Sequence, residues 1–350
     1  MSRLEVASAV ARLAIGCWLL GRVPRIPAAA GRSRPPVAVV VPARDEAATI
    51  GQLLTSTAPQ LGAADELLVV DDHSTDGTAA AAAAGGARVV AAPPLPAGWT
   101  GKAWALDAGV AATSAPVLVL LDADVAVEPG GLDRLVAEHA GRGGLVSVAP
   151  VHVVERPYER LSAVLATVAM MGTGAFTPWR RTPPAGAFGP CLVTARRDLA
   201  AVGGYASVAS DVLDDVALAR RYQAAGLPVT LFGGRGTVRY RMYPGGLRQL
   251  VDGWSKNVAA GAGATRPLIL VLVVAWISVL IQAPWLGPWV YAACVAQLAW
   301  MWARIGRFGV MTALLFPLPL LAFLVVFLRS AVLTLVRRRV PWKGREVRLS

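Results

Sequence analysis

The sequence predicts an α/β protein in which a Rossmann-like, mostly parallel sheet is followed by C-terminal transmembrane helices. Two observations lead to this prediction. Apolar runs without polar alternation each precede a helical stretch, which is typical of buried parallel strands in βα units. In the last third of the chain, residues 267–303 and 308–328 contain no charged residue, and a bilayer crossing needs roughly 20 apolar residues.

The strands and helices of the first domain follow from these runs. Four strand–helix units are predicted, with strands over 37–43, 66–72, 87–92 and 117–124 and helices over 47–56, 77–84, 102–112 and 132–139. A further strand is predicted over 145–154, and further helices over 157–171 and 213–226. The last helix has carboxylates in its first turn and Gly226 at its end, which are start and stop signals.

The N-terminal segment, residues 1–36, is predicted to contact a membrane. Val6 to Leu20 is apolar but short, and Arg12 lies in its middle. An arginine at the centre of a membrane span costs about 2.5–3.5 kcal/mol on insertion scales, so a transmembrane anchor and an interfacial helix are both open. A basic, proline-rich linker follows over 21–36, and the first domain is expected over 37–265.

The C-terminal segment, residues 266–336, is predicted to form membrane helices. Two prolines and a glycine in "APWLGPW" (283–289) break the first apolar run into a helical hairpin. Arg304 and Arg307 follow the hairpin, and 337–350 forms a basic tail. The positive-inside rule places both clusters in the cytosol, so the apolar segment with Pro317 and Pro319 is expected to be re-entrant or interfacial, although an external C-terminus is the competing solution.

The charge distribution agrees with a membrane protein and excludes a nucleic-acid binder. The net charge of +12 is concentrated in the flanks: residues 1–34 and 337–350 each carry +5. Residues 35–265 carry −2, whereas a nucleic-acid-binding domain would show a basic stripe. Basic residues beside apolar segments meet anionic lipid headgroups.

Acidic residues follow three of the predicted strands. They lie within Pro42–Glu46, Asp71–Asp76 and Asp122–Asp124. Ligands of open parallel sheets bind beyond the carboxyl ends of the strands, so these segments are expected to share one rim. Alternation along a strand would turn Asp122 and Asp124 to the same side, where they could hold Mg²⁺ or Mn²⁺. The alternative, a solvated turn that caps a helix, is less favoured because three acidic strand ends converge.

Six motifs together resemble the family 2 glycosyltransferases, which have a GT-A fold. They are "VVVPARDEAATI" (39–50), "LLVVDDHSTDGT" (67–78), "GWTGKAWALDAG" (98–109), "LLDAD" (120–124), "LDDVALARR" (213–221) and "GWSKN" (253–257). The resemblance covers about residues 37–258. The closing "RSAVLTLVRRRVPWKGR" (329–345) is similar to the tail of a membrane-bound bacterial branch that includes carotenoid- and hopanoid-associated enzymes.

The resemblance implies a role for each matching residue. Pro42, Ala43, Arg44 and Glu46 would line the nucleotide pocket, and Asp72 would contact the uracil or the ribose. Asp45 replaces the usual asparagine of the family, which leaves its own role open. Asp122 would contact the ribose or the metal, and Asp124 the metal itself. Lys102, at a predicted helix start, could meet a diphosphate as a point charge.

On the acceptor side, Asp214 and Asp215 take the position of the Glu-Asp pair of the family. The resemblance makes Asp215 the general base, which would take a proton from the acceptor hydroxyl as that oxygen attacks the anomeric carbon. Trp254 takes the place of an acceptor-side tryptophan, and a membrane-interface aromatic is the alternative interpretation. Two carboxylates at a helix start also favour the helix itself.

These assignments predict an inverting, metal-dependent hexosyltransferase of the cell membrane. It would be multi-pass, with a cytosolic catalytic domain, a nucleotide-sugar donor that is UDP-linked, and a lipid acceptor such as a carotenoid, polyprenoid or glycolipid. A polysaccharide synthase is an alternative, but it needs more spans and a Q-x-x-R-W motif that is missing. A non-catalytic nucleotide-sugar-binding scaffold is the other alternative, and it predicts loss of carboxylates that are present at Asp124 and Asp215.

Overall fold

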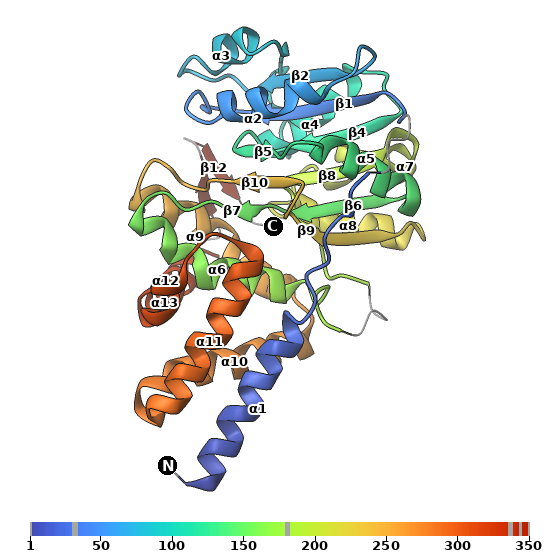
Figure 1. The fold of residues 1–350 in the computed structure, drawn as a ribbon. Helices are drawn as coiled ribbons and strands as arrows, with labels where there is room; N and C mark the ends of the chain where they lie inside the picture. The colour runs from blue at the N-terminus through green and yellow to red at the C-terminus, as the bar shows by residue number, and fades with distance from the viewer. Residues whose placement is uncertain (1, 30–33, 179–182, 335–338, 343–344, 349–350) are drawn as a thin grey trace.

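A computed structural model of the chain describes residues 2–29, 34–178, 183–334, 339–342 and 345–348. The chain forms an α/β domain built on a twisted sheet, and an apolar group of helices projects from one end of it (Figure 1). The mostly parallel α/β architecture predicted from the sequence is therefore confirmed.

The central sheet has seven strands in the order β3-β2-β1-β4-β8-β6-β9. Their bounds are Val37–Ala43 (β1), Glu66–Asp71 (β2), Arg88–Ala91 (β3), Val117–Leu121 (β4), Leu145–Ala149 (β6), Cys191–Ala195 (β8) and Val229–Gly233 (β9). Strand β1 pairs in parallel with β2 and β4, whereas β8 runs antiparallel between β4 and β6. The first three strands were predicted to within about a residue, but β4 is three residues shorter than predicted.

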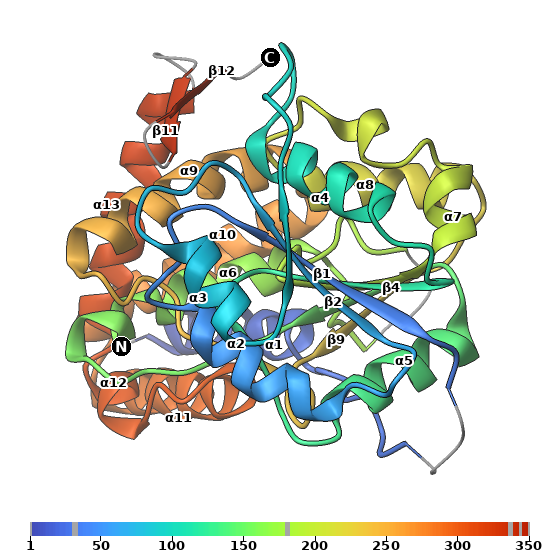
Figure 2. The same cartoon turned by 90° about the horizontal axis from the view of Figure 1, so that it is seen from above.

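Helices cover both faces of this sheet, and the apolar strands explain why. Along β1, Val39 and Val41 pack on one face and Val40 on the other. Figure 2 shows α2 and α5 on one side of the sheet and α4 and α8 on the other. The helix bounds are Ile50–Thr57 (α2), Thr78–Ala84 (α3), Gly101–Ala111 (α4), Gly131–Arg142 (α5), Arg196–Ala201 (α7) and Asp214–Ala224 (α8).

A second, three-stranded sheet lies between the central sheet and the apolar helices. It has the order β5-β10-β7, with bounds Val125–Val127, Val238–Tyr240 and Val151–His152. The predicted strand over 145–154 is therefore two strands. Pro150 separates them, because proline cannot donate a ladder hydrogen bond. A two-stranded hairpin, Arg339–Trp342 (β11) with Arg345–Arg348 (β12), lies in the predicted tail.

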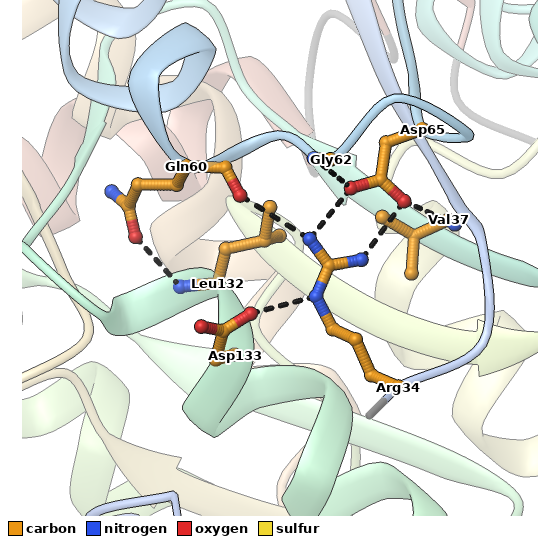
Figure 3. A network of polar contacts seen from close by, with 7 residues as sticks. All are labelled: Arg34, Val37, Gln60, Gly62, Asp65, Leu132 and Asp133. Atoms are coloured by element: carbon orange, nitrogen blue, oxygen red, sulfur yellow. Dashed lines mark hydrogen bonds and ion pairs between the residues drawn. The ribbon is translucent and has the colours of Figure 1, made fainter. Parts of the chain in front are cut away.

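An arginine network joins the linker to the amino end of β1 (Figure 3). The Arg34 guanidinium donates to Asp65 at 2.6 and 2.9 Å, to Asp133 at 2.7 Å and to the Gln60 carbonyl at 3.2 Å. Asp65 also accepts from the Val37 backbone N–H at 3.0 Å. Burial opposes ionisation of Asp65, but these donors lower its pKa below the ordinary value. The network fixes the chain where it enters the sheet.

The remaining helices form the apolar part of the protein. Their bounds are Arg3–Leu19 (α1), Ser162–Gly172 (α6), Leu247–Ala264 (α9), Pro267–Leu286 (α10), Pro288–Ile305 (α11), Val310–Leu314 (α12) and Pro317–Val332 (α13). The predicted hairpin is confirmed: α10 and α11 are separated by Gly287, whose φ of 101° ends the first helix. Among the described residues, α10 is the one helix long and apolar enough to cross a membrane.

Candidate active site

The acidic sequence after β4 lies in a turn and not on the strand. Strand β4 ends at Leu121, and the Val125 N–H donates to the Asp122 carbonyl at 3.1 Å. The prediction that strand alternation aligns Asp122 with Asp124 is therefore wrong, because neither residue lies on the strand. The turn is nevertheless tied to β8, because the Asp122 N–H donates to the Pro190 carbonyl at 3.0 Å, and the charge of Asp122 acts on Asp124.

Lys102 and Asp122 form the central ion pair of this region. Helix α4 begins at Gly101 with Thr100 as its cap, which places Lys102 in the first turn. The Lys102 Nζ lies 2.5 Å from Asp122 Oδ1, and about 30% of each side chain is exposed. Burial opposes the charge on Lys102, but Asp122, Asp214 and Asp215 raise its pKa above the ordinary value. In the structure the lysine thus belongs to the acidic cluster at the rim.

Asp215 lies in the first turn of α8 and faces the same backbone segment as Lys102. Its Oδ2 accepts from the Gly189 N–H at 2.8 Å and its Oδ1 from the Val216 N–H at 2.8 Å. A Cβ on Gly189 would lie 3.2 Å from both Asp215 Oδ2 and Lys102 Nζ. Burial, followed by the charge of the neighbouring buried Asp214, raises the pKa of Asp215 to about 6.

Asp124 lies in surroundings that disfavour the charged form of its carboxyl group. Burial, then the charges of Asp122 and Glu46, raise its pKa to about 8, and Lys102 offsets only part of this shift. Glu46, in the loop after β1, is therefore close enough to the turn after β4 for its charge to act on Asp124. We name Lys102, Asp122, Asp124, Asp214 and Asp215 together the rim cluster.

The loops after β1 and β2 are fastened to each other. Arg44 Nη1 donates to the Asp72 carbonyl at 2.9 Å and lies 3.6 Å from its carboxylate. The Asp72 N–H donates to the Ala43 carbonyl at 2.8 Å. Asp45, at a left-handed φ of 50°, accepts from the Thr75 N–H at 2.8 Å. The structure thus brings Arg44 to Asp72 and gives Asp45 a role in holding the loop. The Glu46 carboxylate instead accepts from the Thr49 hydroxyl at 2.7 Å, and its charge acts on Asp124.

Asp76 has a structural role. Its carboxylate accepts from the Thr78 N–H at 3.1 Å, the Thr78 hydroxyl at 2.5 Å and the Ala47 N–H at 3.0 Å. These bonds cap the start of α3 and join it to the first loop. His73, at a left-handed φ of 58°, lies in the bend between β2 and α3.

The tryptophan and the lysine of the "GWSKN" motif contact different parts of the protein. Trp254 is 9% exposed, packs edge-on to Tyr243, and donates from Nε1 to the Ser162 hydroxyl at 3.0 Å. It thus belongs to the core formed with α6. Lys256, two residues further along α9, lies close enough to Asp214 for its charge to act on that carboxylate.

Sequence reasoning missed two residues of this region, Gly189 and Lys256. Gly189 lies in a segment with no motif, so only the fold reveals its contact with Asp215. Lys256 could have been found, because it stands in the same motif as Trp254. Burial lowers the pKa of Lys256, and Asp214 partly offsets that effect.

Comparisons with known proteins agree with this geometry. The sequence profile described as Glycosyl transferase family 2 matches residues 38–200. A 4,4'-diaponeurosporenoate glycosyltransferase of Staphylococcus haemolyticus is 30% identical over 336 residues, covering 90% of this chain and 89% of that protein. A protein of the same name from Staphylococcus aureus is 30% identical over 331 residues, covering 89% and 88%.

A solved structure shares the fold along almost the whole chain. It is a mannosyltransferase from Pyrobaculum calidifontis in complex with GDP-Man and Mn²⁺, with a TM-score of 0.59, 19% identity and 96% of each chain covered. The GT-A-like fold is therefore confirmed. Because the staphylococcal relatives match over nine-tenths of the chain, the protein is a glycosyltransferase and belongs to family 2 of these enzymes.

Proposed function

We propose that the protein transfers a hexose from a UDP-linked donor, with inversion, to the polar end of a membrane lipid of the carotenoid or polyprenoid type. The observation that carries the proposal is the rim cluster, which gathers carboxylates and a lysine from three separate segments, α4, the turn after β4 and the start of α8. The resemblance of the six motifs supports the uridine nucleotide. The carotenoid acid named for the staphylococcal relatives supports the lipid acceptor.

The donor would lie on the loops after β1 and β2. Arg44 contacts Asp72 there, beside Pro42 and Ala43 at the end of β1, and the Glu46 backbone N–H donates to the Thr78 hydroxyl at 2.8 Å. Asp72 is 4% exposed, and Arg44 contacts both its carbonyl and its carboxylate. In this arrangement the Asp72 carboxylate would be a hydrogen-bond acceptor for the polar edge of a nucleotide base or for a ribose hydroxyl.

The rim cluster fits a divalent cation. Four carboxylates of the cluster and Glu46 stand against Lys102 and Lys256. The raised pKa values of Asp124 and Asp215 follow first from burial and then from the neighbouring negative charges. Among the described residues, no group of three His, Cys, Asp or Glu side chains is arranged to hold a metal ion by itself. Donor phosphate oxygens would therefore have to complete the shell of a Mg²⁺ or Mn²⁺ ion at Asp122 and Asp124. Such a cation neutralises charge on the departing diphosphate.

Asp215 would act on the acceptor. For an alcohol, its carboxylate takes the hydroxyl proton while the oxygen forms a bond to the anomeric carbon and the bond to the diphosphate oxygen breaks. One displacement of this kind inverts the anomeric centre. Gly189 and Val216 hold both carboxylate oxygens, so the base is fixed in place before substrate arrives.

For a carboxylic acid acceptor no base is needed, and Asp215 would orient the group. An anionic acceptor must then approach a cluster that is already negative, which requires a cation on the acceptor side. Lys256 supplies it, because it lies on α9 close to Asp214 and Asp215. Asp214 would hold the lysine by its charge, and Trp254 would fix the helix by packing on α6.

The apolar helices would hold the rim at the membrane surface. In Figure 1, α1, α10 and α11 project together away from the domain. Trp285 and Trp289, at the turn between α10 and α11, are 81% and 86% exposed, as expected for aromatics at a membrane interface. Helix α10, with 20 residues, is about 30 Å long. We propose that these three helices cross the bilayer.

Polar contacts within this bundle support a membrane location. Arg12 donates to the Ser278 hydroxyl and to Gln282 Oε1 of α10, each at 3.0 Å. Gln297 of α11 accepts from the Trp276 indole at 2.8 Å and donates to the Leu13 carbonyl of α1 at 2.6 Å. Polar pairs between helices, of this type, join helices in lipid.

Helix α13 would instead lie along the cytosolic surface. Arg329 donates to Asp252 of α9 at 2.6 Å, and the Ser330 hydroxyl donates to the Ser255 carbonyl at 2.6 Å. Its opposite face exposes Leu321, Val325, Leu328 and others to lipid. This arrangement keeps the C-terminus on the side of the catalytic domain, and a C-terminal reporter active only outside the cytosol would contradict it.

Two experiments test the function. Lipid profiles of cells with and without the gene should differ by one glycolipid, and an unchanged profile would contradict the proposal. The Asp215→Ala protein should bind a UDP-sugar in the presence of Mn²⁺ yet fail to transfer it. Asp211→Ala is the matched control, because this exposed aspartate stands four residues before Asp215 and its backbone N–H donates to the Val208 carbonyl at 3.1 Å, away from Gly189.

A further inference from the structure

A cavity of about 70 Å³ lies where the apolar helices join the catalytic domain. Its walls are Val23, Arg25, Gly233, Arg235 and Arg304. These residues come from the linker after α1, the end of β9, the turn before β10 and the last turn of α11. At about 30 Å³ for one water, the cavity has room for a group of a few heavy atoms.

The backbone around the cavity is firmly joined. The Gly233 N–H donates to the Pro24 carbonyl at 2.8 Å, and Arg25 forms a β-bridge with Gly233. A Cβ on Gly233 would lie 2.4 Å from Val23 Cγ1, so a glycine is needed for this close approach. The linker is therefore fixed against the end of β9.

Two of the three arginines are held in place by neutral groups. Arg304 Nη1 donates to the Leu20 and Gly21 carbonyls at 3.1 Å each, and its guanidinium lies 4.5 Å from the Trp300 ring centroid. Arg235 Nε donates to the Arg304 carbonyl at 3.4 Å. Within the part of the chain that the structure describes, none of the three cavity arginines forms an ion pair with a carboxylate.

Three guanidinium groups around one small cavity repel each other unless an anion lies among them. Arginine presents a planar fork of donors that matches phosphate oxygens. Along α11, Arg304 is 15 residues from Trp289, or about 22 Å from the far turn of the hairpin, so the cavity lies at the end of the helix next to the catalytic domain.

We propose that Arg25, Arg235 and Arg304 form a binding site for a phosphate group, separate from the rim cluster. The phosphate could come from a phospholipid headgroup or from free inorganic phosphate. In either case it would join the linker after α1, the turn between β9 and β10 and the last turn of α11 through charge-assisted hydrogen bonds, and it would hold the catalytic domain in a fixed position relative to the apolar helices.

The test uses the full-length protein in a neutral detergent. It measures the rise in melting temperature when each compound is added and the amount of that compound that stays bound to the purified protein. Phosphatidylglycerol is added in one arm, diacylglycerol in a second, inorganic phosphate in a third and chloride in a fourth. Stabilisation by phosphatidylglycerol alone assigns a lipid phosphate, and stabilisation by inorganic phosphate as well assigns a free anion site. Equal behaviour in all four arms overturns the proposal.

Variants identify the site. Arg25→Gln and Arg235→Gln should each weaken phosphate affinity about tenfold or more, since a charge-assisted hydrogen bond contributes about 1.5–3 kcal/mol. Arg307→Gln is the matched control, because this exposed arginine follows the same helix but does not line the cavity. If Arg307→Gln lowers the affinity as much as the two cavity variants, the effect is general surface charge and the site is refuted.

Discussion

Replacement of Asp215 by asparagine should affect two classes of acceptor very differently. Asparagine keeps the size of the side chain and one oxygen for the Gly189 N–H, but it cannot accept a proton. For an alcohol acceptor, loss of the general base should lower kcat about 10²–10⁴-fold. For a carboxylate acceptor, which brings its own nucleophilic oxygen, the base is not needed.

The magnitude of the second effect follows from the hydrogen bonds of Asp215. Both of its oxygens accept backbone N–H groups, at 2.8 Å each. Asparagine can replace only one of these acceptors, and one lost hydrogen bond costs roughly 0.5–1.5 kcal/mol. Transfer to a carboxylate should therefore fall by about tenfold or less.

The assay compares a carotenoid acid with the alcohol obtained by its reduction, in the same detergent and with the same donor. Product is measured at saturating donor for the wild type and for Asp215→Asn. Losses of equal size with both acceptors would refute the assignment of Asp215 as a base. They would indicate a role in binding or in the structure of the Gly189 segment.

Three further predictions concern charge. Asp214→Asn removes a negative charge that raises the pKa of Asp215. It should therefore move the acid limb of the kcat/KM profile for an alcohol acceptor from about pH 6 to a lower pH. An acid limb that stays in place would contradict an effect of the Asp214 charge on Asp215. Because the pKa of Asp124 is raised to about 8, the folded state holds a proton that the unfolded state releases near pH 4. The metal-free protein should therefore lose stability as the pH rises from about 4 to 8, by up to about 1.4 kcal/mol per pH unit, and Asp124→Asn should flatten this slope in denaturant titrations. Arg34→Gln should destabilise the protein by roughly 3 kcal/mol, since Asp65 would remain buried without its partner, and Asp65→Asn combined with it should recover part of the loss.

The first strands of the sheet could be predicted because their central residues are apolar. Residues 37–43 contain no polar residue, and the polar residues of 66–72 stand only at its two ends, so β1 and β2 lie where expected. Strand β8 could not be predicted, since "CLVTA" (191–195) is short and its antiparallel place between β4 and β6 depends on distant pairing. Local sequence does not encode that pairing.

The sequence predicts most of the residues of the site but not the contacts between them. Acidic residues after β4 and at the start of α8 stand out in sequence, and both belong to the rim cluster. Lys102 was expected at a diphosphate, but only the fold shows its ion pair with Asp122. Trp254 and Lys256 stand two residues apart, and the choice between them depends on how α9 packs against α6.

Helix α9 connects the two halves of the enzyme. One side of it is held by α13 through Asp252 and Ser255, and another presents Lys256 to the rim cluster. An acceptor with an apolar chain and a polar end must place the chain in lipid and the end beside Asp215. Because the same helix contacts α13 and carries Lys256 close to the rim cluster, the depth of the proposed anchor would fix the height at which an acceptor can react. Acceptor selection in this protein would then depend on the distance between the polar end and the apolar chain, as well as on the shape of a sugar pocket.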